Sequence, residues 1–107
     1  MTSTKPTDFI KADSSKTRMS LIDPDFIIGL ADILTHGAEK YAADNWKLID
    51  PSELYRYKDA LLRHLYAYLS GELIDQDSGR PHLDCVAFNV MALRYFEHGQ
   101  GNPNFKG

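Results

Sequence analysis

The stretch from Arg63 to Asn89 constrains the fold of this 107-residue chain more than any other. Apolar residues recur at helical spacing before it and resume at that spacing after it. Between the two helical patterns lie two histidines and several acids, including a Glu-x-x-Asp pair at 72 and 75. A small domain seldom concentrates so many polar groups between two helix halves. The pattern therefore predicts a divalent-metal site held between two helices.

Two of the expected helices open on an Asp-Pro pair. Asp23 and Pro24 provide an acidic N-cap and a proline at the first helical position, and the apolar spacing that follows predicts a helix to about Thr35. Asp50 and Pro51 open a second helix in the same way, and an acid three residues after the cap completes a capping-box pattern. The glycine at 37 either ends the first helix or only bends it.

A third helix is expected after the turn that ends the polar stretch. Gly71 falls where the C-cap of the second helix belongs, although a helix continuing to Asp75 is the alternative. Pro81 then opens the third helix, which stops near His98. Its apolar stripe is predicted at Leu83, Val86, Val90 and Leu93, with His82 and Asn89 on an adjacent face. No strand-like alternation persists, so the fold class is all-α, a small bundle of three to four helices.

Length and composition narrow the function classes. The chain is expected to form one domain over 1–107, with mobile tails at 1–10 and 99–107, and to be completed by a partner subunit in a homo-oligomer. The single cysteine, Cys85, and the absence of a signal-peptide layout or apolar run favour a cytoplasmic protein without a membrane partner. Scattered basic residues and a net charge of −3 disfavour a nucleic-acid polymer but not a mononucleotide.

The polar stretch offers a metal site and catalytic groups. Glu72 and Asp75 are expected to bind Mg²⁺ or Mn²⁺, which prefer oxygen ligands and keep waters that a phosphate displaces. His64 on the second helix and His82 at the start of the third are the expected additional ligands. Glu72, Asp75 and His64 are the candidate catalytic residues, since a carboxylate or an imidazole takes the proton of an attacking water. The alternative is a solvated acid pair and hydrogen-bonded core histidines.

Cations and an amide are placed to hold a nucleotide. Lys16 and Arg18, in a polar segment rich in hydroxyls, are candidates for gripping phosphate oxygens, and Lys40 and Arg63 join them. The alternative for the first pair is a solvated tail. Asn45 and Trp46 are expected to line a base pocket, with a structural anchor as the alternative role of the tryptophan. A phosphate loop is absent, and Cys85 amid apolar neighbours is a weak nucleophile.

The ordered motifs resemble a known family. K-x-D-x-x-K-x-R near the N-terminus is followed by G-A-x-K-Y, N-W, R-H, G-E-x-x-D and S-G-x-x-H, over about residues 11–96. This set resembles the phage and prophage dATP/dGTP diphosphohydrolases, relatives of the MazG-like all-α nucleoside triphosphate pyrophosphohydrolases. The resemblance implies Mg²⁺-dependent cleavage between the α- and β-phosphates, homo-oligomeric assembly as a dimer or dimer of dimers, and the host cytoplasm as the location if the protein is phage-encoded. MazG-type enzymes also carry E-E-x-x-E, which this chain lacks.

The leading hypothesis is therefore a metal-dependent hydrolase that converts a purine deoxynucleoside triphosphate to the monophosphate and pyrophosphate. Two rival hypotheses remain. One is a non-catalytic phage factor that captures a nucleotide or a protein with the same pocket, and the other is a purely structural helical oligomer.

Overall fold

The computed structural model describes residues 6–106, and they form an all-helical bundle that confirms the predicted fold class. Three helices make up the bundle: α1 (Pro24–Lys40), α2 (Tyr55–Leu69) and α3 (His82–His98). Three short 3-10 helices accompany them: η1 (Met19–Leu21), η2 (Asn45–Leu48) and η3 (Pro51–Glu53). Within the described residues no strand forms, and one isolated bridge pairs Ile74 with Pro81.

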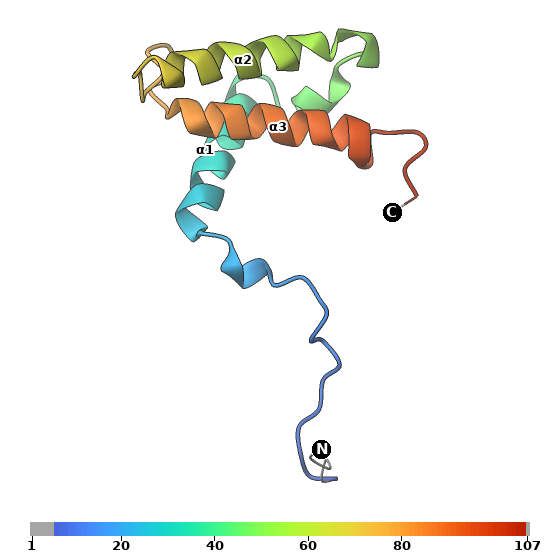
Figure 1. Cartoon of the computed structure of the whole chain (residues 1–107). Helices are drawn as coiled ribbons and strands as arrows, with labels where there is room; N and C mark the ends of the chain where they lie inside the picture. Colours follow the sequence, from blue (N-terminus) through green and yellow to red (C-terminus); the bar gives the residue numbers. More distant parts are fainter. Residues whose placement is uncertain (1–5, 107) are drawn as a thin grey trace.

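The helix α3 is the central element, because it packs on both α1 and α2. Figure 1 shows α2 and α3 side by side and antiparallel, with α1 crossing them near the end of α3 that follows the polar loop. The chain before α1 runs away from the bundle, and its side chains from residue 6 to residue 22 are all exposed. Within residues 6–106, no helix combines the length and the apolar character that crossing a membrane requires.

Local caps explain where the helices begin. The Asp23 side chain accepts a hydrogen bond from the Phe26 backbone N–H at 3.3 Å, so the predicted N-cap of α1 is confirmed. This helix continues past Thr35 to Lys40, and Gly37 neither ends it nor interrupts it. Asp50 caps the short η3 instead of α2, by accepting from the Ser52 N–H at 2.9 Å.

The end of α2 is set by Gly71, which has a φ of +105°. The Gly71 N–H donates to the Tyr68 carbonyl at 3.0 Å, and the Glu72 N–H donates to the Ala67 carbonyl at 3.1 Å. These two bonds form a Schellman motif, which satisfies carbonyls that a helix end otherwise leaves unpaired. The predicted C-cap at Gly71 is confirmed, and the alternative of a helix continuing to Asp75 is wrong. Glu72 and Asp75 therefore leave the helix and enter a tight loop.

The buried face of α3 is not the one that its apolar residues predicted. Four described side chains are buried, and they form a stripe at helical spacing along α3: His82, Cys85, Asn89 and Ala92. The predicted apolar stripe is partly outside, since Leu83 and Val90 are 47% and 49% exposed. The reason is that polar side chains fill the interior where α3 meets its two neighbours. Apolar residues on the outer flank remain uncovered in a single chain.

The segment after α3 folds back onto it. The Gly101 N–H donates to the Tyr95 carbonyl at 3.1 Å, and the Asn102 side chain donates to the Glu97 carbonyl at 2.8 Å. These bonds place Phe105 and Gln100 in a shallow second pocket beside Trp46. The mobility predicted for 99–107 stays a prediction, and residues 1–5 and 107 lie outside the described chain.

Candidate functional site

Two imidazoles and a carboxylate converge between α2 and α3. Donor atoms of His64, Asp75 and His82 all lie within 4.8 Å of one another. His64 comes from the last turns of α2, His82 is the first residue of α3, and Asp75 comes from the loop that joins the two helices. Three residues that the sequence proposed as metal ligands are therefore brought together by the fold.

A compact loop holds the Asp75 carboxylate. Its Oδ2 accepts from the Ser78 hydroxyl at 2.7 Å and from the Ser78 N–H at 3.3 Å. The hydrogen bond from the Ser78 hydroxyl is the largest reason that the pKa of Asp75 lies below its ordinary value. The loop is closed by backbone bonds from the Asp75 N–H to the Arg80 carbonyl and from the His82 N–H to the Leu73 carbonyl. Asp75 is thus an ionised, oriented acceptor.

The loop is also tied to α1 by Arg80. The Arg80 Nε donates to the Asp32 carboxylate at 2.7 Å, and its Nη1 donates to the Ser78 carbonyl at 3.0 Å. These two contacts tie the loop to α1.

The two histidines face each other, and His82 is almost inaccessible to solvent. Their Nδ1 atoms are 2.9 Å apart, and His82 is 3% exposed. The other ring nitrogen of His82, Nε2, is 2.7 Å from Oε1 of Glu72. Burial is the largest cause that lowers the pKa of His64, an effect that the nearby Asp75 carboxylate opposes. His64 is consequently neutral at pH 7 and keeps a nitrogen lone pair.

Glu72 does not stand in the cluster where the sequence placed it. Its side chain is 44% exposed, and its oxygen contacts the outer nitrogen of His82. The cause is local, because the helix ends before Glu72 and the Glu-x-x-Asp spacing no longer aligns two carboxylates on one helical face. Glu72 therefore lies behind His82, while Asp75 lies in front of it with His64.

These residues fit a divalent cation. Imidazole nitrogens and a carboxylate oxygen are common metal ligands in proteins, and three of them within 4.8 Å match a coordination sphere. A ligating histidine that donates its second N–H to a carboxylate is also the usual arrangement at metal centres, and His82 with Glu72 has it. The donor set is thus chemically complete enough to hold an ion with solvent or substrate filling the remaining positions.

A large open pocket of about 1500 Å³ adjoins the cluster. Typical small-molecule sites are about 300–1,000 Å³, so a nucleotide has ample room. Its walls come from the second half of α1, the 41–50 loop, the start of α2 and the middle of α3. His64 belongs both to the cluster and to this wall. A cation on the cluster would therefore lie at the edge of the pocket.

The pocket gathers most of the predicted nucleotide-binding residues. Lys40, Asn45, Trp46 and Arg63 all line it. Lys16 and Arg18 do not, since they lie on the exposed segment that leaves the bundle. The fold therefore brings four of the six candidates together. The other two lie on the N-terminal segment, which runs away from the bundle.

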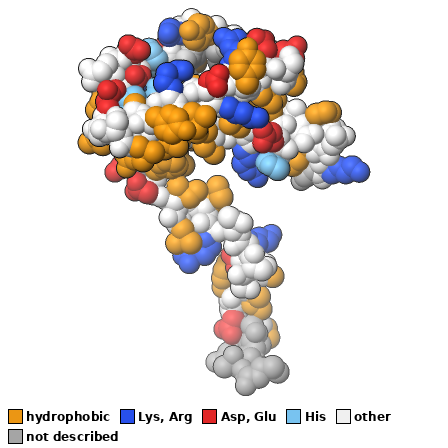
Figure 2. Space-filling view, turned by 45° about the horizontal axis from the view of Figure 1, so that its top comes forward, with side chains coloured by type: hydrophobic (Ala, Val, Ile, Leu, Met, Phe, Trp, Pro, Cys, Tyr) orange, Lys and Arg blue, Asp and Glu red, His pale blue; other side chains and the backbone are white. Residues whose placement is uncertain are grey.

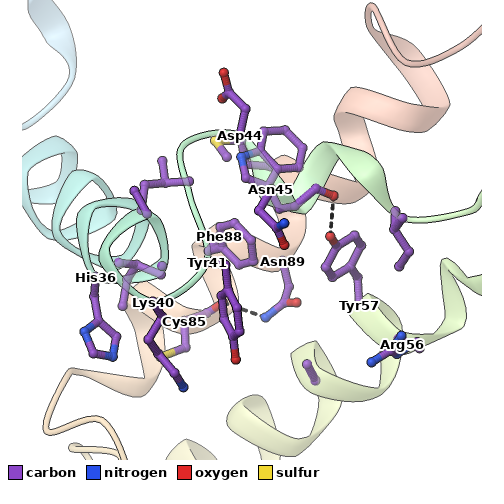
Figure 3. A pocket seen from close by; sticks show the side chains of 18 of the residues that line it. His36, Lys40, Tyr41, Asp44, Asn45, Arg56, Tyr57, Cys85, Phe88 and Asn89 are labelled. Carbon is purple, nitrogen blue, oxygen red and sulfur yellow. Dashed lines mark hydrogen bonds between the residues drawn. The ribbon is translucent and has the colours of Figure 1, made fainter.

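The loop that carries Asn45 and Trp46 is anchored by aromatic contacts. The Trp46 ring meets Phe88, Tyr95 and Phe96 edge to face, at centroid distances of 6.1, 5.0 and 6.4 Å. The backbone carbonyl of Trp46 accepts a hydrogen bond from the Tyr57 hydroxyl at 2.6 Å (Figure 3). This tryptophan is a structural anchor, the alternative that the sequence left open, and it also forms part of the pocket wall.

Tyr41 and Asn89 are two of the pocket residues that were not among the predicted binding residues. Figure 3 shows Tyr41 lying across the pocket and Asn89 reaching toward it from α3. The NH₂ group of the Asn89 side chain donates to the Cys85 carbonyl at 2.8 Å, which leaves the side-chain oxygen of Asn89 as an acceptor. Both residues had a sequence signal: Asn89 lies seven residues after His82 on one face of α3, and Tyr41 ends the G-A-x-K-Y motif.

Comparisons with known proteins place the chain in a family. The family model described as "dATP/dGTP diphosphohydrolase, N-terminal" matches residues 7–103. A dATP/dGTP diphosphohydrolase from Salmonella phage PMBT28 is 33% identical over 84 residues, which are 78% of this chain. The chain spans only 28% of that relative's length. No solved structure matches the chain significantly. On the extent of the family match, the chain belongs to the dATP/dGTP diphosphohydrolase N-terminal domain family.

Proposed function

We propose that this domain hydrolyses a purine deoxynucleoside triphosphate, dATP or dGTP, to the monophosphate and pyrophosphate with the help of a divalent cation. The observation that carries the proposal is the position of His64, which belongs both to the histidine–aspartate cluster and to the wall of the pocket. Membership of the diphosphohydrolase family supports the same reaction. His64, Asp75 and His82 would hold the cation.

Lys40 and Arg63 are the residues proposed to hold the phosphates. Three other charged groups of the pocket wall form ion pairs, since Glu53 pairs with Arg56 at 3.8 Å and Asp44 pairs with Lys47 at 3.4 Å. Within the described chain, neither Lys40 nor Arg63 forms an ion pair, and both side chains are exposed on the pocket wall. Unpaired cations beside a cation site suit a triphosphate, whose charge they share.

The proton chemistry is assigned to Asp75. When bound, the divalent cation would neutralise phosphate charge and lower the pKa of the attacking water. Asp75, kept ionised by Ser78, is able to accept the proton of that water with carboxylate lone pairs that the cation does not use, whereas the lone pair of the neutral His64 would be taken up by the cation. Asn45, with Trp46 as an apolar wall, is proposed to bind the base.

One experiment separates this activity from its rivals. Protein would be incubated with each dNTP, ATP or GTP, in Mg²⁺ or in Mn²⁺, and pyrophosphate, inorganic phosphate and melting temperature would be followed together. Hydrolysis between the α- and β-phosphates predicts pyrophosphate and monophosphate from purine deoxynucleotides, without inorganic phosphate. A rise in melting temperature without any product would point to a non-catalytic nucleotide-binding protein. If neither a product nor a shift in melting temperature is observed, the purely structural oligomer is the remaining hypothesis.

We further propose that the domain forms a homo-oligomer. Exposed apolar side chains recur on one face of α2, at Tyr55, Leu62, Tyr66 and Leu69, with exposed fractions from 42% to 67%. Figure 2 shows hydrophobic side chains gathered on the surface of the bundle and again along the projecting N-terminal segment. An exposed apolar stripe of this kind is typical of a subunit interface.

Light scattering coupled to size exclusion tests this assembly. We expect a mass of at least twice the 12.1 kDa of one chain, and a shift toward the monomer for Leu62→Glu, because a carboxylate in an apolar interface is costly to bury. A wild-type protein that elutes as a monomer at all concentrations tested would contradict the proposal.

A further inference from the structure

We infer that the histidine–aspartate cluster selects a first-row transition-metal ion over Mg²⁺, and that Glu72 positions His82 instead of ligating the ion. The inference rests on the proposed function only for the location of the site. It concerns which ion the residues accept and how they are oriented, and it departs from the expectation of an oxygen-ligated Mg²⁺ centre built on the Glu-x-x-Asp pair.

The contact between Glu72 and His82 fixes where the His82 proton is. A carboxylate only accepts hydrogen bonds, so at 2.7 Å from Oε1 the Nε2 atom of His82 carries the hydrogen. In a neutral imidazole the other nitrogen then has a lone pair. That nitrogen, Nδ1, points into the space it shares with His64, at a position that is 3% exposed.

Something must lie between the two Nδ1 atoms. At 2.9 Å, two nitrogen lone pairs facing each other repel, so the gap requires either a proton on one of the two rings or a cation bound to both.

Asp75 distinguishes a cation site from a simple histidine–histidine hydrogen bond. A hydrogen bond needs only two rings, whereas an ionised carboxylate with a donor atom within 4.8 Å of both supplies a third ligand and a negative charge. Ser78 holds this carboxylate in place, which gives the group a fixed direction before any ion arrives. The loop around it is thus built for the carboxylate to face the histidines.

The composition of the cluster decides which ion is preferred. Two imidazole nitrogens and one carboxylate form a donor set that suits Fe²⁺, Co²⁺, Ni²⁺ or Zn²⁺. Mg²⁺ instead takes oxygen ligands and retains most of its waters. The second carboxylate that would have made an oxygen-rich site, Glu72, contacts the far side of the His82 ring. The site therefore discriminates through nitrogen ligation.

Glu72 acts through His82, as a positioning residue. Carboxylates that accept the second N–H of a ligating histidine fix its tautomer and raise its basicity, and their loss typically weakens metal binding by about 10–100-fold. The Schellman motif at Gly71 ends α2 just before Glu72, and this turn directs the carboxylate toward His82. Glutamine at position 72 keeps the length of the side chain. Its amide can either donate to His82 Nε2 or accept from it, so it no longer fixes the tautomer of His82.

Titration of the whole chain with Co²⁺, without nucleotide, tests both parts of the inference. Visible absorption bands displaced from those of the aqueous Co²⁺ ion report nitrogen ligation, and calorimetry compares the affinities for Co²⁺, Mn²⁺ and Mg²⁺. We expect saturable Co²⁺ binding with one site per chain, at least 100-fold tighter than Mg²⁺. We expect Glu72→Gln to weaken Co²⁺ binding by about 10–100-fold with its absorption bands retained, and His64→Phe to abolish them. Glu97→Gln, an exposed carboxylate of α3 away from the cluster, is the matched control.

The outcomes separate this inference from the proposed hydrolysis. Absence of Co²⁺ bands in folded wild-type protein, or Mg²⁺ affinity equal to that for Co²⁺, would overturn the ion preference. Loss of the bands in folded Glu72→Gln, as in His64→Phe, would make Glu72 a ligand and overturn its positioning role. Unchanged Co²⁺ affinity in Glu72→Gln would show that Glu72 has no role at the site, and would also overturn that part of the inference. Co²⁺ binding without any hydrolysis would leave the inference standing and refute only the proposed function.

Discussion

Alanine in place of His64 is expected to reduce pyrophosphate release from dATP or dGTP by at least about 100-fold, since loss of a carboxylate that merely orients a ligand already weakens such sites by about 10–100-fold. His64 contributes a donor atom to the cluster and a wall to the pocket. Its removal takes away one of three ligands and leaves His82 Nδ1 facing an empty space. The measurement is initial rate against substrate concentration at saturating divalent ion.

His98→Ala is the matched control for this prediction. His98 is an exposed histidine at the last turn of α3, outside the cluster and outside the pocket. The His98→Ala variant should release pyrophosphate at the wild-type rate, and its far-ultraviolet circular dichroism spectrum should match that of the His64→Ala variant. Equal rates for wild type and folded His64→Ala would remove the histidine–aspartate cluster from the reaction altogether.

Alanine in place of Trp46 is expected to lower the free energy of unfolding by about 2–4 kcal/mol, somewhat less than the about 3–5 kcal/mol for removing a large aromatic side chain from a core, because this ring is partly exposed. The indole ring makes three edge-to-face contacts with α3, and it fixes the 41–50 loop against that helix. Aromatic pairs of this kind stabilise beyond the area they bury. Urea denaturation followed by far-ultraviolet circular dichroism measures the loss.

Trp46→Phe provides the comparison, because a smaller aromatic ring retains part of the same contacts. It should lose clearly less stability than the alanine variant. If both variants unfold within about 1 kcal/mol of the wild type, the aromatic cluster is not what anchors the loop. In that case Trp46 would be free for a role at the base instead.

Much of the architecture was predictable because the signals are local. The N-cap Asp23, the C-cap Gly71 and Pro81 each act on the backbone within a few residues, so their effect does not depend on the rest of the fold. Three of the four proposed metal ligands were also recognisable from their residue types around the α2–α3 turn. His64, Asp75 and His82 meet because that turn brings the two helix ends together.

The errors came from treating each helix as if it had one apolar face toward a core. Leu83 and Val90 follow the spacing of a buried stripe, yet both are about half exposed. The interior of this bundle carries His82 and Asn89, whose polar groups are satisfied by Glu72, His64 and a backbone carbonyl. Spacing alone does not tell a face that packs inward from a face left open on a single chain.

The sequence by itself determined that the chain is helical, where α1 begins, where α2 ends and which polar residues stand at the α2–α3 turn, since all of these follow from contacts a few residues apart. Only the tertiary structure decided that Asp75 faces the histidine pair while Glu72 supports His82 from behind, and that Lys40 and Arg63 reach one pocket without Lys16 and Arg18. Those outcomes depend on how α1, α2 and α3 pack, and packing is set by long-range contacts that no short stretch of sequence encodes.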